Sequence, residues 1–114
     1  MSDFMFLFRG GRTEASTSPE AMQAQMQKWR AWMQKLREQG KYVSGEPLES
    51  GGKVLRSPNK VITDGPFAEG KEVVGGFFLV RAETLEQATD MAKECPIFET
   101  GGSVEVRKVQ VMNP

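Results

Sequence analysis

One carboxylate, Asp64, is the side chain best placed for chemistry. It opens the sequence Asp-Gly-Pro-Phe at residues 64–67, shortly before the apolar run at residues 73–80. A carboxylate that a rigid loop holds at the mouth of a pocket can act as a general base or anchor a ligand. An aspartate ahead of Gly-Pro can also accept backbone N–H hydrogen bonds and shape its own turn. The residues allow both roles, alone or together.

Four further side chains could bind a ligand near this carboxylate. Arg107 could clamp a substrate carboxylate, because a guanidinium group binds one through two parallel hydrogen bonds. It could equally form a structural ion pair with Glu105, which shares its strand face. Phe67 could form a pocket wall, or it could fix its loop onto the core. Trp32 and Tyr42 could line a cavity between helix and sheet.

The chain contains no histidine, and this narrows the possible chemistry. Ser-His-Asp and Cys-His machinery and His-ligated metal sites are excluded within one chain. The single cysteine, Cys95, has no histidine to activate it, so we expect it to be buried. None of the paired glycines stands in a phosphate-binding pattern. We therefore expect neither a metal nor another cofactor.

Length and charge favour a small soluble protein with a small-molecule or protein partner. The 114 residues are enough for one domain, which we place at residues 1–114. The 15 basic and 15 acidic residues cancel, which argues against nucleic acid and against a membrane surface held by charge. No signal peptide or long apolar segment is visible, so we expect a cytoplasmic protein.

The apolar periodicity predicts the elements that position these side chains. Ser18-Pro19 begins a helix that ends near Gly40, and Thr84 caps a second helix that ends at Pro96. The first helix is expected to bury one apolar stripe, with Trp32 at its edge; the stripe consists of Met22, Met26, Trp29, Met33 and Leu36. Strands are expected at residues 4–9, 41–47, 73–81 and 103–112, the last with a bulge near residues 107–108, and a small hairpin joins residues 54–55 to 61–62.

This order of elements predicts an α+β, ferredoxin-like fold, βαββαβ with an extra short hairpin. In that fold both helices cover the same face of the sheet. The strands at residues 4–9 and 73–81 are nevertheless apolar on both faces. Because a bare apolar face is rare on a monomer, we expect two chains to pack sheet to sheet as a homodimer.

Several of these segments resemble the YCII-related domain family. Residues 64–69, followed by residues 71–72 and the glycine-aromatic strand at 74–78, resemble its DGPF signature. Residues 88–96, which end in Cys-Pro, and residues 102–107 resemble its second helix and its closing strand. The resemblance covers most of the chain. It implies a ferredoxin-like domain that dimerises into an α+β barrel.

The resemblance does not imply one reaction. Some family members are proposed enzymes with a His-Asp pair, and related dimeric barrels include lactone isomerases, dehydrochlorinases and small monooxygenases. Here Asp64 is present in the motif but the histidine is absent, and Arg107-Lys108 replaces the usual Arg-Pro.

Two functions therefore stay open. One is a small-molecule-binding or regulatory homodimer, which the missing histidine favours. The alternative is a small cofactor-independent enzyme, lyase-like or isomerase-like, that acts on a small anionic organic substrate. In that case Asp64 would serve as the acid–base group and Arg107 as the anchor.

Overall fold

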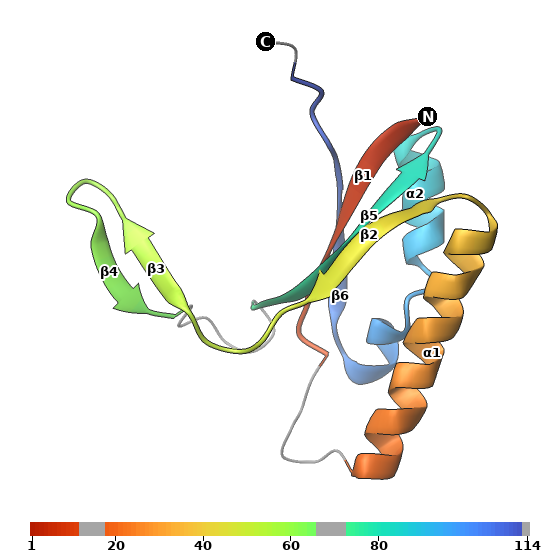
Figure 1. Ribbon diagram of the computed structural model, residues 1–114, viewed down its shortest axis with the longest axis horizontal. Helices are drawn as coiled ribbons and strands as arrows, with labels where there is room; N and C mark the ends of the chain where they lie inside the picture. The colour runs from red at the N-terminus through yellow and green to blue at the C-terminus, as the bar shows by residue number, and fades with distance from the viewer. Residues whose placement is uncertain (12–17, 66–72, 113–114) are drawn as a thin grey trace.

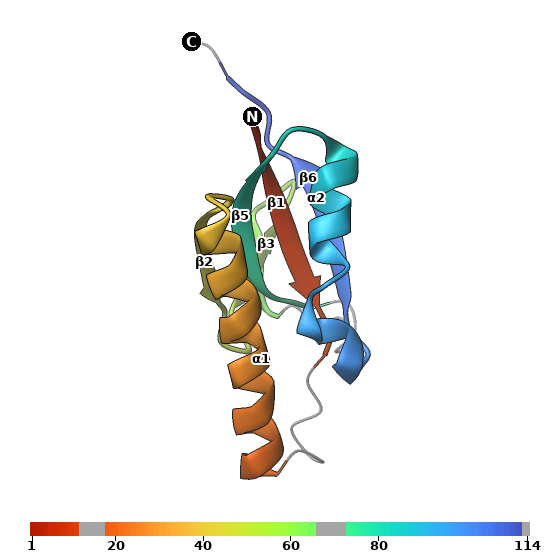
Figure 2. The same ribbon diagram turned by 90° about the vertical axis from the view of Figure 1, so that its right-hand side faces the viewer.

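The computed structural model describes residues 1–11, 18–65 and 73–112. Two helices cover one face of a four-stranded sheet, and a two-stranded hairpin stands apart from it (Figures 1 and 2). The elements follow in the order β1 (Ser2–Arg9), α1 (Pro19–Glu38), β2 (Tyr42–Pro47), β3 (Lys53–Arg56), β4 (Val61–Asp64), β5 (Val74–Ala82), α2 (Leu85–Ala92), the 3-10 helix η3 (Pro96–Thr100) and β6 (Ser103–Lys108).

The sheet has the strand order β2-β5-β1-β6, and every neighbouring pair is antiparallel. β5 lies between β1 and β2, and β1 lies between β5 and β6, so each helix connects two strands that are not neighbours. This is the ferredoxin-like α+β arrangement, and it confirms the predicted fold. The extra hairpin is the pair β3–β4.

Helix α1 begins where local chemistry predicts. The Ser18 hydroxyl accepts a hydrogen bond from the backbone N–H of Ala21 at 3.1 Å, and Pro19 occupies the first helical position. Such a cap satisfies one of the N–H groups that a helix start leaves unpaired. The helix ends at Glu38, and Gly40 follows with φ +70°, a conformation that favours glycine.

The buried stripe of α1 differs from the prediction. Trp32 and Leu36 are buried and Trp29 is partly buried, whereas the side chains of Met22 and Met26 are both 53% exposed. Figures 1 and 2 show the reason, because the first turns of α1 extend past the end of the sheet. The placement of Met22 and Met26 in the core and of Trp32 at its edge was therefore wrong.

An aromatic cluster fills the space between α1 and the sheet. Trp32 stacks on Phe78 and on Phe6, with ring centroids 5.1 and 6.1 Å apart. Phe8 meets Trp29 edge to face at 4.9 Å. These ring pairs add to the burial of apolar area that stabilises the fold. The buried core is completed by Phe4, Leu36, Val80, Ala82, Ala88, Met91, Ala92, Cys95 and Ile97.

The last helix and strand are shorter than predicted. α2 ends at Ala92, before Pro96, and a 3-10 turn that was not predicted follows. β6 ends at Lys108, and its register with β1 is continuous, so the expected strand to residue 112 and its bulge were wrong. The reason is that the pairing with β1 stops at Lys108, opposite Phe4, so residues 109–112 have no strand partner among the described residues. The last contact is a hydrogen bond from the Val109 N–H to the Asp3 carbonyl at 2.9 Å.

The second face of the sheet carries no described helix (Figure 1). Its centre is formed by two cross-strand pairs of partly buried apolar residues, Met5 with Leu79 and Leu7 with Phe77. An ion pair between Asp3 and Arg81 at 3.7 Å lies at one end. We call this surface the open face. It is the apolar surface on which the prediction of a sheet-to-sheet homodimer depends.

Candidate functional site

The structure distributes the predicted site residues over three places. Trp32 and Tyr42 lie on the helix-covered side of the sheet, where both pack against Phe78. Arg107 lies on the open face, in register with Met5. Asp64 ends β4 in the hairpin. Phe67 lies outside the described residues.

Asp64 is an exposed, ion-paired carboxylate. The register of the hairpin places Lys53 opposite Asp64, and the lysine ammonium group donates a hydrogen bond to the carboxylate. The Asp64 side chain is 75% exposed. In a single chain it therefore lies at the base of the hairpin, and it contacts Lys53 rather than Arg107 or Tyr42.

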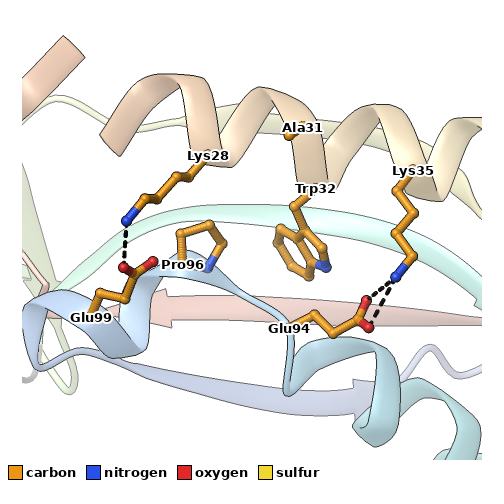
Figure 3. A pocket seen from close by; sticks show the side chains of 7 residues that line it. All are labelled: Lys28, Ala31, Trp32, Lys35, Glu94, Pro96 and Glu99. Carbon is orange, nitrogen blue, oxygen red and sulfur yellow. Dashed lines mark hydrogen bonds and ion pairs between the residues drawn. The ribbon is translucent and has the colours of Figure 1, made fainter. Parts of the chain in front are cut away.

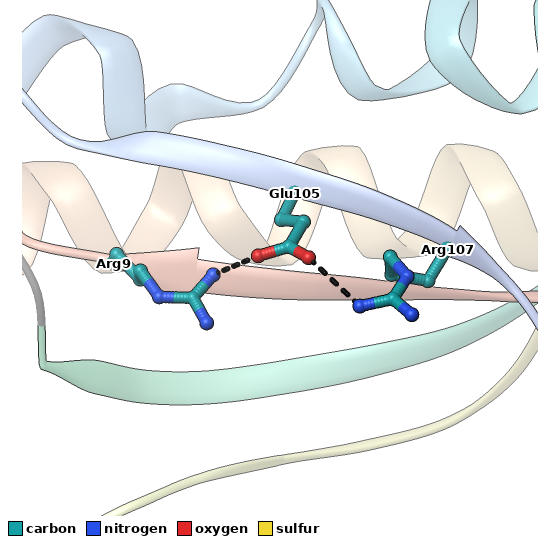
Figure 4. Close-up of polar contacts among 3 residues, drawn as sticks. All are labelled: Arg9, Glu105 and Arg107. Atoms are coloured by element: carbon teal, nitrogen blue, oxygen red, sulfur yellow. Dashed lines mark hydrogen bonds and ion pairs between the residues drawn. The ribbon is translucent and has the colours of Figure 1, made fainter.

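Three charged side chains meet at the margin of the open face (Figure 4). The Glu105 carboxylate accepts hydrogen bonds from Arg9 at 2.5 Å and from Arg107 at 3.1 Å. Arg107, and after it Arg9, lowers the pKa of the Glu105 carboxyl below its usual value. The Arg107 side chain remains 70% exposed, so the guanidinium group has donors to spare for a second anion.

Arg9 was not among the site residues predicted from the sequence. The sequence nevertheless contains a pattern that predicts the contact between Arg9 and Glu105. Arg9 alternates with Phe8 on β1, and Glu105 alternates with Val104 and Val106 on β6. Both charges therefore belong to the face opposite the core, on neighbouring strands, which brings them into diagonal contact.

A groove of about 420 Å³ runs between α1 and the segment that joins α2 to η3 (Figure 3). Its walls are bridged by two ion pairs, Lys28 with Glu99 at 2.6 Å and Lys35 with Glu94 at 3.0 Å. Its lining is completed by the apolar surfaces of Ala31, Trp32 and Pro96. The arrangement is a shallow, open groove with an apolar floor and one lysine near each end.

A hydrogen bond also joins the two walls of the groove. The Gln25 side-chain amide donates a hydrogen bond to the carbonyl of Pro96 at 2.9 Å. Because Pro96 is buried and begins η3, this bond fixes α1 against that short helix. Gln25 was not predicted to have a role, because glutamines are frequent along this helix and nothing in the sequence distinguishes this one.

One polar atom beside the groove has no hydrogen-bond partner among the described residues. The indole nitrogen Nε1 of Trp32 is buried and has no hydrogen-bond partner among the described residues, and the whole side chain is 4% exposed. Figure 3 shows the ring between Pro96 and Glu94, with the nitrogen toward the Lys35–Glu94 end. A buried donor without a partner costs about 1–3 kcal/mol. An acceptor placed at this end of the groove would recover that energy.

Tyr42 belongs to the core wall rather than to the groove. Its ring meets Phe78 edge to face at 5.1 Å, and the Arg37 guanidinium group lies over the ring, 5.0 Å from its centroid. Such a cation–π contact fixes the ring at the edge strand β2.

The cysteine is buried, as expected. Burial raises the pKa of the Cys95 thiol to about 12, although a hydrogen bond with the backbone of Ile97 acts in the opposite direction. The thiol therefore stays protonated at neutral pH, and a protonated thiol is a poor nucleophile.

Within residues 1–11, 18–65 and 73–112, no group of three or more Cys, Asp or Glu side chains could hold a metal ion. No helix in this part of the chain is long and apolar enough to cross a membrane.

Comparison with known proteins gives one family and two individual matches. A model of the YCII-related domain matches residues 4–113. An uncharacterised protein of Rhizobium meliloti (strain 1021) is 38% identical over 55 residues, which cover 47% of this chain and 44% of that protein. The match thus spans less than half the length of that relative. The structure of 5-chloro-2-hydroxyhydroquinone dehydrochlorinase from Burkholderia phenoliruptrix AC1100, in complex with 2,5-dihydroxybenzoquinone, superposes with a TM-score of 0.48 at 17% identity, over 95% of this chain and 93% of that one.

Proposed function

The chain belongs to the YCII-related domain family, and from its groove and its open face we propose that it is a homodimer that binds a small organic anion. The proposal of a ligand rests on the buried indole N–H of Trp32, which points toward the groove and has no hydrogen-bond partner among the described residues. The groove is the binding site in this proposal, and the open face is the dimer contact.

The side chains that line the groove favour a ligand with an anionic oxygen and an apolar part. An anionic oxygen between Trp32 and Lys35 would accept a hydrogen bond from the indole nitrogen and an ion pair from the ammonium group. It would replace Glu94, whose bond to Lys35 joins two half-exposed side chains. Exposed ion pairs are worth about 0–1 kcal/mol, so the exchange costs less than the indole hydrogen bond recovers. The apolar part of the ligand would lie against Ala31 and Pro96.

The open face supports the homodimer. An apolar centre bordered by charged side chains has the composition of a protein interface. The chain also exposes 8402 Å² of surface at a mass of 12.7 kDa, whereas a compact monomer of that mass exposes about 6200 Å². The excess, to which the projecting hairpin contributes as well, exceeds the roughly 800 Å² that each partner buries in an interface of ordinary size. Two sheets packed through this face would form a closed α+β barrel.

A pair of lysine substitutions tests the ligand site. Lys28 and Lys35 are matched, since both side chains are 53% exposed and each binds one glutamate across the groove. Small carboxylates such as benzoate and butyrate are titrated by calorimetry against the wild type and the variants. We expect Lys35→Gln and Trp32→Phe to weaken binding about tenfold, the equivalent of about 1.4 kcal/mol. Lys28→Gln, at the far end, is expected to change the affinity much less.

Equal affinities for Lys35→Gln, Trp32→Phe and the wild type would contradict a site in the groove. Conversion of a ligand to product that is lost in Asp64→Asn would support the enzymatic alternative instead.

A further inference from the structure

The β3–β4 hairpin has little contact with the other described elements of its own chain. Beyond the pairing of its two strands, it does not pack extensively on another described element. A hydrogen bond from the Gly65 N–H to the Gly52 carbonyl at 3.1 Å closes its base. Leu55, Val61 and Ile62 are 60%, 53% and 62% exposed. An isolated two-stranded hairpin is marginally stable in water, so this one needs a second surface.

The two faces of the hairpin differ in character. Residues that pair across strands share a face, and every second residue along a strand returns to it. The register therefore places the Lys53–Asp64 pair and the Leu55–Ile62 pair on one face. This face joins the most exposed apolar pair of the hairpin to the carboxylate of the family motif. We call it the arm face.

The position of the hairpin indicates what covers the arm face. Figure 1 shows that the hairpin leaves the body on the side opposite the helices, which is the side of the open face. A second copy seated on the open face would lie beside the hairpin. Charge agrees with this occupant. Arg56 and Lys60 make the far end of the hairpin basic, and Glu46 and Glu49 are exposed in and after edge strand β2, with Glu46 in register with Phe77 of the open face.

We propose that the hairpin is an exchanged arm, which lays its Leu55–Ile62 face on the second copy of the chain beside the partner's β2 edge. The inference rests on the proposed homodimer and extends it. Because Asp64 shares the arm face, the same contact encloses the Lys53–Asp64 pair between the two chains. The surroundings of Asp64 are then completed by the other copy, and a single chain carries only one side of this site.

Hydrogen exchange at two protein concentrations tests the arm. The backbone amides of residues 53–64 are followed by mass spectrometry above and below the dissociation constant of the wild-type dimer. We expect slow exchange in the dimer and fast exchange in the monomer. Ile62→Asp should weaken dimerisation at least tenfold and abolish the slow exchange of the arm. Met22→Asp alters a side chain of similar exposure on α1 and should change neither.

The possible results distinguish the proposal of the exchanged arm from the proposal of the homodimer. A wild-type chain that stays monomeric overturns both proposals. A stable dimer in which the arm exchanges fast and Ile62→Asp has no effect overturns the arm alone. Slow exchange of the arm at every concentration would mean that it docks on its own chain, and it too would overturn the exchange. Leu55→Asp repeats the test from the opposite strand.

Discussion

At the scale of single residues, seven ion pairs join charged side chains in the described part of the chain. The Arg9–Glu105–Arg107 cluster is the clearest case, because one carboxylate binds two guanidinium groups from two strands. Trp32 is a contrasting case, because its buried indole N–H has no hydrogen-bond partner among the described residues. The same residue stacks on two phenylalanines, so its position is held by the core while its nitrogen faces the groove.

The lowered pKa of Glu105 predicts a dependence of stability on pH. A carboxyl group whose pKa is lower in the folded than in the unfolded chain stabilises the fold above its ordinary pKa. That contribution is lost as the pH falls through the lowered, folded value. We expect Glu105→Gln to be less stable than the wild type at neutral pH and to approach it in acid. Urea unfolding at fixed protein concentration measures the difference.

Arg107→Gln should reproduce part of this effect, since Arg107 is the largest cause of the shift. A difference between Glu105→Gln and the wild type that stays the same from neutral to acid pH would refute this explanation.

At the scale of elements, the helix starts depend on single hydrogen bonds at their caps. The Ser18 hydroxyl caps α1, and the Thr84 hydroxyl caps α2 through the Gln87 N–H at 3.0 Å. Gln87 in turn accepts a hydrogen bond from the Glu83 N–H at 2.7 Å. Both starts were predictable, because a cap is a contact among residues three or four positions apart in the chain.

Removal of the α1 cap should lower the stability of the fold by a small but measurable amount. We expect Ser18→Ala to lower the free energy of unfolding by about 1 kcal/mol. Ser18→Asn keeps an acceptor at the cap and should stay close to the wild type. Thermal or urea unfolding compares the three proteins, and equal losses for both variants would mean that the hydroxyl does not cap the helix.

The ends and buried faces of the elements were less predictable than their starts. Met22 and Met26 continue the apolar spacing of Trp29 and Leu36, yet the sheet does not reach them. β6 pairs with β1 only as far as Lys108, which lies opposite Phe4. Each of these limits depends on the length of a distant element, which local periodicity does not contain. For the same reason the sequence grouped Trp32 with Arg107, although the sheet separates them.

At the scale of the whole molecule, the chain is flat and extended. Its radius of gyration is 15.8 Å and its extents are 48 × 44 × 19 Å, whereas a compact chain of this length has a radius of gyration of about 13 Å. The hairpin accounts for much of the length (Figure 1). A molecule of this shape has one broad sheet face and one projecting element left to cover, and a second copy would cover both.

The proposed assembly predicts the effect of a charge at the centre of the open face. Leu79→Arg should shift the wild-type dimer toward monomers, because an unpaired guanidinium group would be buried between two apolar sheets. Met22→Arg adds the same charge to the exposed start of α1 and should leave the dimer intact. Sedimentation equilibrium compares them, and equal association of the two variants would contradict a contact through this face.

The hydrogen bond between Gly65 and Gly52 also bears on how this protein could diverge. Because it brings the two ends of the hairpin together, residues 53–64 can vary in length and composition while the sheet and helices keep their places. A gene duplicate altered only in this segment would carry an arm that fits its own copies better than those of its ancestor. The hairpin would then determine which chains associate, and it would keep the subunits of related proteins in one cell from forming mixed dimers.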